Sequence, residues 1–517
     1  MASAVKSSYF DVIVVGAGSA GAALAARLTE DPKRKVLLVE AGPDYANIDE
    51  LPDEIRQGHG TGTDLAIDPD GIHNWGFTAR ATPLQPDMPV PRGKITGGTS
   101  AINGQVFLRP IPEDFEFWVS EGNDEWSYEK VLPFLSNLEN DLDFSDQYHG
   151  NDGPIVVRRY RPDELVEDQA AFIEAVTAAG FSITEDHNHP ASSGVGPLPL
   201  NNPDGIRWST ALGYLSGARD RPNLTISPDT HATRVLIADN QAVGIQVAVN
   251  GELVEVHGKE VVLCAGAIGS PHLLMLSGLG PRKQLEAAGI DVIADLPGVG
   301  QNLRDHPSVH VRWRAEEDFP MPDVETGPQK VALRYTARGS EFRNDMIAVM
   351  RWNSTNREFL MSAGVYLAKS SGELRLSSSD PFRQPELDYR LLDHLYDLSR
   401  MRDAVRMHIE FGRHTAYKGI LKELIDPLPE DLESDSTLDN WLLRRAHTMH
   451  HISCTAKMGP DSDRMAVVDQ YGRVREIDGL RVADISIMPD CPRANTNSAA
   501  ILIGERIADF MRSQRAG

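Results

Sequence analysis

Residues 11–21 read DVIVVGAGSAG, and this stretch decides the fold. Its β-branched first half, 11–15, is typical of a strand that is buried on both faces. Glycines then interrupt the run, and the strong helix formers of 22–28 follow them. A second apolar run, VLLV at 36–39, ends at Glu40. A strand, a helix and a strand in such close succession predict a βαβ unit and a parallel sheet, which places the chain in the α/β class.

The three glycines of the turn have the GxGxxG spacing. Gly16 permits the tight turn, Gly18 lets the backbone approach a pyrophosphate at the helix N-terminus, and Gly21 lets the helix pack closely on the strand. Glu40 can accept hydrogen bonds from a ribose diol, and its charge disfavours the 2′-phosphate of NADP. The unit therefore predicts dinucleotide binding rather than a turn without a ligand. It does not separate FAD from NAD.

The composition is that of a folded globular protein. Of 517 residues, 41% are hydrophobic and 24% are charged, which excludes a disordered chain. Acidic residues outnumber basic residues by 75 to 51, and the resulting net charge of −24 repels nucleic-acid phosphates and anionic lipid. The three cysteines are scattered, so we expect neither a disulfide framework nor a metal site. No apolar run approaches the roughly 20 residues of a membrane span, and the short polar start leaves no room for a signal peptide. We therefore predict a cytoplasmic protein with no nucleic-acid partner and no membrane span.

The remainder of the chain mixes helices and strands. Amphipathic spacing predicts helices at 128–138, 169–179, 392–415 and 499–512. Alternation predicts an antiparallel meander and then one buried strand, at 224–227, 232–238, 242–249, 252–256 and 259–264. Further strands are expected within 307–376, most clearly where Val309, Val311 and Trp313 alternate with polar residues. Between residues 44 and 91 we expect a long irregular excursion.

Two further segments carry chemistry. The glycine-dense run PRGKITGGTSAING at 91–104 suggests a backbone that approaches a flat ligand, or alternatively a mobile surface loop. Near the C-terminus, His450 and His451 begin the run HHISCTAKMG, and Asn497 opens the final helix. A converging histidine and asparagine would suit alcohol chemistry, because the imidazole takes the hydroxyl proton while the amide steadies the oxygen. The alternatives are a structural role for the histidine and a helix cap for Asn497.

Together these segments resemble the glucose–methanol–choline (GMC) family of FAD-dependent oxidoreductases. The similarity covers nearly the whole chain and includes further blocks at 91–118, 266–280, 298–307 and 480–489. The resemblance implies a Rossmann-like FAD-binding domain interleaved with a substrate domain that is built on an antiparallel sheet with helices. The expected FAD-binding domain comprises 1–155, 205–305 and 460–517, and the expected substrate-binding domain comprises 156–204 and 306–459.

The resemblance also implies site residues. His451 matches the family's proton-accepting histidine, and Asn497 matches the second member of the catalytic pair. The residues expected to bind FAD are Gly16, Gly18, Ser19, Ala20, Gly21, Glu40, Ala41, Gly98, Thr99, Asn103, Gly104, Ala232, Asp484, Asn497, Ser498 and Ala499. Ile102 stands where some relatives carry a flavin-linking histidine, so we expect FAD to be non-covalent. Ile452 and Cys454 replace the proline and glycine of the family's His-Pro-x-Gly-Thr pattern, so the loop that carries the base is expected to sit differently.

The expected activity is the oxidation of a small-molecule alcohol. His451 would remove the hydroxyl proton while the carbinol hydride passes to flavin N5, and the electrons would go to dioxygen or another acceptor. The alternatives are a sugar or glycoside oxidase, a non-redox relative resembling hydroxynitrile lyases, an NAD dehydrogenase, and a binding protein that has lost catalysis. Within the family, the segments at 103–105 and 143–150 resemble those of the bacterial aryl-alcohol and hydroxymethylfurfural oxidases. It predicts neither the particular alcohol nor the oligomeric state.

Overall fold

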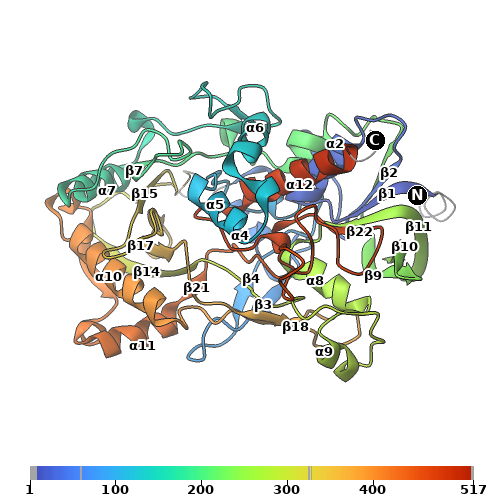
Figure 1. Cartoon of the computed structure of the whole chain (residues 1–517). Helices are drawn as coiled ribbons and strands as arrows, with labels where there is room; N and C mark the ends of the chain where they lie inside the picture. Colours follow the sequence, from blue (N-terminus) through green and yellow to red (C-terminus); the bar gives the residue numbers. More distant parts are fainter. Residues whose placement is uncertain (1–8, 59–60, 324–326, 328, 514–517) are drawn as a thin grey trace.

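The computed structural model describes residues 9–58, 61–323, 327 and 329–513. Within them the chain forms two seven-stranded sheets. Figure 1 shows the first sheet at the right of the view and the second at the left, each with helices beside it. The predicted α/β class with a further antiparallel sheet is confirmed.

The first sheet is parallel along the order β8-β2-β1-β11-β22. These strands are β1 (Phe10–Val15), β2 (Val36–Val39), β8 (Leu224–Ser227), β11 (Glu252–Leu263) and β22 (Leu480–Val482). Its antiparallel extension is formed by β9 (His231–Ala238) and β10 (Gln241–Val249). The predicted βαβ unit is confirmed, with α2 (Ser19–Leu28) between β1 and β2. Every residue of β2 is buried, as expected for a strand with both faces covered.

The predicted meander is wrong in two respects. β8 does not join it, because β8 pairs in parallel with β2 on the far side of the sheet. The strands predicted at 252–256 and 259–264 are the single strand β11, since Gly258 lies opposite Phe10 and continues the ladder. The first half of β11 pairs antiparallel with β10, and the second half pairs parallel with β1. An alternation of apolar and polar residues predicts a strand but does not identify the strand that pairs with it. A single glycine within such a run does not by itself end the strand.

The second sheet is antiparallel throughout, in the order β20-β14-β17-β16-β15-β7 with β21 beside β14. Its strands are β7 (Gly194–Pro197), β14 (Pro307–Ala315), β15 (Val331–Tyr335), β16 (Met346–Asn353), β17 (Glu358–Val365), β20 (Leu421–Asp426) and β21 (His447–Thr448). The alternation predicted around residues 309–313 is confirmed in β14, where Val309 and Val311 are buried. The residue bounds of the two domains stay a prediction.

The predicted long helices are confirmed with shifted ends. They are α6 (Tyr128–Asn137), α7 (Glu167–Ala178), α10 (Leu395–Gly412) and α12 (Thr496–Ser513). The described residues of the predicted irregular excursion form short elements, which include α3 (Asp53–Arg56), α4 (Thr61–Ala66), β3 (Phe77–Ala79) and β4 (Met88–Val90). The other elements are α5 (Pro112–Ser120), β5 (Glu139–Asp141), β6 (Ile155–Val157), α8 (Gly266–Leu276), β12 (Leu279–Gly280), α9 (Arg282–Ala287), β13 (Ala294–Asp295), β18 (Glu373–Arg375), β19 (Glu386–Asp388) and α11 (Asp435–Arg445). No helix among the described residues combines the length and the apolar character that a membrane crossing needs.

The contact between α2 and α12 positions the site. The two helices pack against each other, and they lie side by side in Figure 1. A Cβ added at Gly504 of α12 would lie only 2.3 Å from the carbonyl oxygen of Ala20. At the start of the helices, the Ser19 hydroxyl donates to Asn497 Oδ1 at 2.8 Å. This close crossing brings the N-terminal turns of the first and the last long helix to one place.

Candidate active site

A cavity of about 1240 Å³ is lined by residues of both sheets. The first sheet contributes residues at or just beyond the carboxyl ends of its strands, such as Val15, Val39 and Cys264. Parallel sheets bind their ligands at this edge. The second sheet contributes side chains of β14, β16 and β17, such as His310 and Arg351. A pocket for one small ligand usually has about 300–1,000 Å³, so this cavity has room for a dinucleotide and a substrate together.

The glycine-rich turn exposes backbone to this cavity. Gly16 has a φ of +101°, in the region that favours glycine. Gly18 caps α2 without a side chain, and a Cβ added to it would meet only Gly98 Cα, at 3.8 Å. The backbone N–H groups of the first turn of α2 are therefore open to an anion in the cavity. Gly21 has the packing role predicted for it, because its Cβ would lie 1.9 Å from the Gly16 carbonyl oxygen.

Glu40 is a buried carboxylate at the end of β2. Its two oxygens accept from the backbone N–H groups of Ala17 and Gly42, each at 3.0 Å. Burial raises the pKa of Glu40 to about 7, although these backbone donors oppose the shift. The carboxyl group lines the cavity and retains acceptor capacity beyond its two bonds. A diol that donates to it would stabilise the charged form.

Asp484 fixes a second edge of the cavity. One carboxylate oxygen accepts from the Gly266 N–H at 2.9 Å and the Ser270 hydroxyl at 2.5 Å, and the other accepts from the Ser486 N–H at 2.8 Å. These bonds tie the loop after β22 to the start of α8. Gly266 itself has a φ of +76°, and an added Cβ would meet no protein atom within 4 Å.

The glycine-dense run at 91–104 is largely buried and bonded to the body of the protein, which favours the predicted approach to a ligand over a surface loop. Arg207 is buried and donates to the carbonyl oxygens of Ala101 at 2.8 Å and Asn103 at 2.9 Å. Ile102, at the position of a possible flavin link, is buried against the cavity.

The residues expected to bind FAD fall into two groups. Those that line the cavity are Gly16, Gly18, Ser19, Ala20, Glu40, Ala41, Gly98, Thr99, Asn103, Gly104, Ala232, Asp484 and Asn497. Those that do not are Gly21, Ser498 and Ala499. The Ser498 hydroxyl instead donates to the Leu108 carbonyl oxygen at 2.6 Å, and Ala499 is completely buried. An open helix N-terminus, glycines without Cβ atoms and a buried ribose acceptor fit FAD, which these lining residues would hold.

His451 lies on the cavity wall in a chain of three side chains. Its Nδ1 is 2.9 Å from His306 Nδ1, and His306 Nε2 is 3.1 Å from Cys491 Sγ. The Cys491 thiol in turn donates to the carbonyl oxygen of His451 at 3.7 Å. All three side chains are buried.

One placement of the protons satisfies every contact of this chain. Burial raises the pKa of Cys491 far above its ordinary value, so the group stays a thiol, and in this placement its proton lies toward the His451 carbonyl oxygen. Cys491 Sγ then accepts from His306 Nε2–H, and His306 Nδ1 accepts from His451 Nδ1–H. Nε2 of His451 is left with a free lone pair. Burial, with the neighbouring His306, His450 and Arg92, lowers the pKa of His451 well below 6.5, so the ring is neutral near pH 7.

The two asparagines at the start of α12 differ in their contacts. Asn497 accepts from Ser19 at the glycine-rich turn. Asn495 accepts from the Tyr366 hydroxyl at 3.2 Å, and the Tyr366 ring packs on His306 with centroids 4.7 Å apart. Both asparagines line the cavity. Asn495 thus belongs to the His451 side, and Asn497 to the side of α2.

The backbone around His451 is unusual. His450 has a φ of +66° and Cys454 a φ of +68°, which are left-handed conformations that favour glycine. Cys454 stands where the family pattern has glycine, so the substitution retains the glycine-like conformation. Backbone bonds between Ser453 and Arg304, at 2.9 Å and 3.1 Å, and the bond from the His451 N–H to Asp305 Oδ1 at 2.9 Å hold the loop.

Comparison with known proteins gives the family. Two family models described as GMC oxidoreductase match residues 10–308 and 368–504. The chain belongs to the GMC oxidoreductases. Members of this family are FAD-binding flavoenzymes that oxidise alcohols.

The relatives of this GMC oxidoreductase match over almost their whole length. It is 34% identical to an uncharacterized GMC-type oxidoreductase in the thcA 5′ region of Rhodococcus erythropolis, over 98% of this chain and 99% of the relative. It is 36% identical to an oxygen-dependent choline dehydrogenase of Burkholderia pseudomallei, over 98% and 94%. Among solved structures, pyridoxine 4-oxidase from Mesorbium loti superposes with a TM-score of 0.90 at 29% identity, covering 98% and 99% of the two chains.

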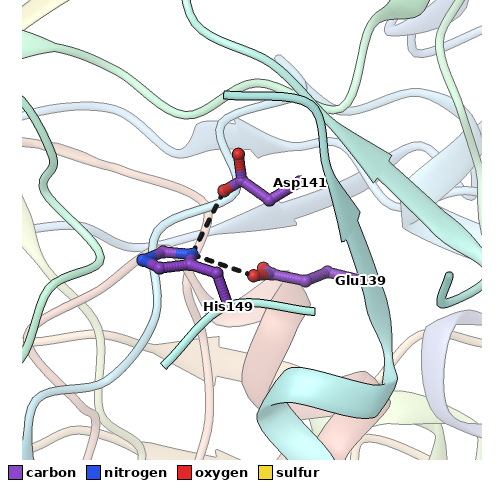
Figure 2. Close-up of side chains that lie close together, drawn as sticks. All are labelled: Glu139, Asp141 and His149. Carbon is purple, nitrogen blue, oxygen red and sulfur yellow. Dashed lines mark hydrogen bonds and ion pairs between the residues drawn. The ribbon is translucent and has the colours of Figure 1, made fainter. Parts of the chain in front are cut away.

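Outside the cavity, one group of side chains in the described part of the chain has metal-ligand chemistry. Figure 2 shows Glu139 and Asp141, both from β5, facing His149. His149 Nδ1 lies 3.1 Å from Glu139 Oε1 and 3.2 Å from Asp141 Oδ2, and its Nε2 lies 3.0 Å from Asp186 Oδ2. Burial would lower the pKa of His149, but the bonds to these carboxylates outweigh it and raise the pKa to about 11.

The charges of this buried group are already matched. Arg109 pairs with Glu139, and Arg159 pairs with Asp141 at 2.8 Å and with Asp186 at 2.7 Å. Three carboxylates thus face two guanidinium groups and one imidazolium. A divalent cation would have to displace the proton of His149 and approach both arginines. The group is therefore an ion-pair network of the fold, and its chemistry does not fit a metal.

Sequence reasoning missed His306, Tyr366, Cys491 and Asn495. His306 lies in the block at 298–307 on which the family resemblance rests, so the sequence contained a signal that could have marked it as a site residue. Its contact with His451, however, joins residues 145 positions apart and leaves no local pattern.

Proposed function

We propose that this GMC oxidoreductase oxidises an alcohol to an aldehyde or ketone with His451 as the general base. The observation that supports this role is the chain His451–His306–Cys491, whose contacts are all satisfied when a neutral His451 keeps a free Nε2 on the cavity wall. A buried neutral imidazole accepts a proton in a place from which bulk water is excluded. Relatives named choline dehydrogenase and pyridoxine 4-oxidase are consistent with a small-molecule substrate.

In the proposed reaction, His451 Nε2 takes the hydroxyl proton of the substrate as the carbinol carbon loses a hydride. FAD, when bound, supplies the acceptor for that hydride. The residues along the α2 turn, with Glu40 and Asp484, would hold the cofactor at the edge of the first sheet. The second sheet would close the substrate side and keep water away from the reacting atoms.

We assign the amide that steadies the substrate oxygen to Asn495, in place of Asn497. The contacts support this choice, because Asn495 reaches the base through Tyr366 and His306, whereas Asn497 is bonded to Ser19. Asn497 keeps its predicted place among the cofactor-binding residues.

Two further proposals, on the attachment of FAD and on the oxidant, are based on the sequence. We propose that FAD is held without a covalent bond, since Ile102 offers no nucleophile. We propose dioxygen, or failing that another electron acceptor, as the oxidant of the enzyme in each cycle. The cytoplasmic location and the domain bounds rest on the sequence alone.

The test compares His451→Ala with His450→Ala in anaerobic flavin reduction by an alcohol. Both variants should bind FAD and look yellow. Loss of the base should slow reduction by about 10²–10⁴-fold in His451→Ala, and the change in His450→Ala should be far smaller. If His450→Ala is the crippled variant and His451→Ala reduces its flavin at the parent rate, the assignment is wrong.

A matched pair of variants tests the asparagines. Asn495→Ala should slow anaerobic flavin reduction while the protein retains its flavin. Asn497→Ala should loosen FAD binding, measured by flavin content after dialysis, with a smaller effect on the reduction rate of the flavin-loaded fraction. The reverse pattern would restore Asn497 to the catalytic pair.

A further inference from the structure

The substrate side of the cavity contains a cation without a carboxylate partner. Arg351 comes from β16, is partly buried and lines the cavity. Its guanidinium forms neither a hydrogen bond nor an ion pair with any residue in the described ranges. Burial lowers its pKa, and Asp64, at the cavity edge, is the carboxylate that opposes the shift from a distance. A guanidinium in a partly desolvated wall gains most from a directly bound anion.

Arg351 stands beside three histidines that also line the cavity. They are His310, His447 and His450. Burial lowers the pKa of each, and the charge of Arg351 lowers it further. The rings of His310 and His447 lie 4.2 Å apart, and His310 Nδ1 pairs with the Ser362 hydroxyl at 2.8 Å. These imidazoles are neutral, so this part of the wall has the charge of Arg351 and neutral hydrogen-bonding groups around it.

The cation lies on the same wall as the base. The positive charges of Arg351 and Arg92 both lower the pKa of His450, which precedes His451 in the chain. Arg92 has a carboxylate near it, since its charge lowers the pKa of Asp305 against the effect of burial. Arg351, by contrast, has no carboxylate at bonding distance among the described residues and is open to a ligand in the cavity.

We infer that Arg351 binds a carboxylate at the far end of the substrate, so that the preferred substrates are alcohols that carry a carboxylate. This inference rests on the proposed function. A guanidinium presents a planar fork that matches a carboxylate with two parallel hydrogen bonds. An alcohol with a quaternary ammonium group would instead bring a like charge to Arg351, and this repulsion disfavours such a ligand.

The experiment uses 4-(hydroxymethyl)benzoate and its neutral twin 4-(hydroxymethyl)benzamide with the flavin-loaded enzyme. The parent should have a kcat/KM at least about tenfold higher for the acid, as expected for a charge-assisted hydrogen bond. Arg351→Met should remove this preference by lowering kcat/KM for the acid alone, and Arg351→Lys should retain part of it. Arg383→Met is the matched control: Arg383 lines the same cavity beside Phe382, which packs on His231 near Ala232, and its loss should leave the preference unchanged.

A second measurement does not depend on turnover. Benzoate, which has no hydroxyl to oxidise, should bind the parent and perturb the flavin spectrum, and Arg351→Met should weaken its binding at least about tenfold. If the parent oxidises the amide as well as the acid, or if Arg351→Met slows both equally, the inference is overturned while the proposed function stands. If no alcohol reduces the flavin but benzoate binding still depends on Arg351, the anion site stands and the proposed function fails.

Discussion

Replacing His306 with leucine should slow proton removal from the substrate without removing FAD. His306 is completely buried, and its ring nitrogens contact His451 and Cys491. In the proposed tautomer, His306 Nδ1 accepts from His451 Nδ1–H at 2.9 Å. Leucine fills a similar volume but accepts no hydrogen bond. The tautomer of His451 that is protonated on Nδ1 and leaves Nε2 free is then no longer stabilised.

The magnitude follows from that single bond. Without the acceptor, the working tautomer buries an unsatisfied N–H group, which costs about 1–3 kcal/mol. Recovering that tautomer before each proton transfer slows the step by about 5- to 150-fold. His306→Asn offers an amide oxygen near the position of the lost Nδ1 and should restore most of the rate.

The assay is the anaerobic rate of flavin reduction by a saturating alcohol, with flavin content and thermal unfolding measured on the same samples. A purely structural role of His306 would lower the melting temperature of both variants without separating their rates. A His306→Leu enzyme that holds its flavin and reduces it at the parent rate would refute the argument that His306 selects the tautomer.

Further predictions address the cofactor site, the base and the ion-pair network. Gly18→Glu should purify without flavin, because the side chain would enter the space left by the missing Cβ with a charge of the same sign as a pyrophosphate; a flavin-loaded variant would contradict this. The acid limb of the flavin-reduction rate should lie below pH 6.5, because the lowered pKa keeps His451 neutral as the pH falls through its ordinary value; a limb at or above neutral pH would place the base elsewhere. His149→Asn should lower the free energy of unfolding by about 3–5 kcal/mol, whereas EDTA should leave the melting temperature of the parent unchanged. The pKa of His149 is raised by folding, so its contribution is complete below its unfolded value near 6.5 and is lost as the pH rises through about 11.

The parts of the fold that the sequence predicted are those with local signals. The run at 11–21 and the acid at Glu40 fix the first βαβ unit because periodicity and glycine spacing act within a few residues of one another. The partner of β8 could not be predicted in this way, since an alternating strand carries no information about the strand beside it. The same holds for the site: family blocks located His451, but its orientation depends on His306 and Cys491, which approach it from distant segments.

The crossing of α2 and α12 also determines when the cofactor site can exist. Ser19 at the glycine-rich turn and Asn497 are 478 positions apart in the chain, and β22 and Asp484 also follow long after the first βαβ unit. During synthesis the βαβ unit therefore exists for a long interval before the segments that complete the cavity emerge. A ribosome that stalls before the codons for β22 consequently leaves a product that lacks Asp484 and Asn497 at its dinucleotide site.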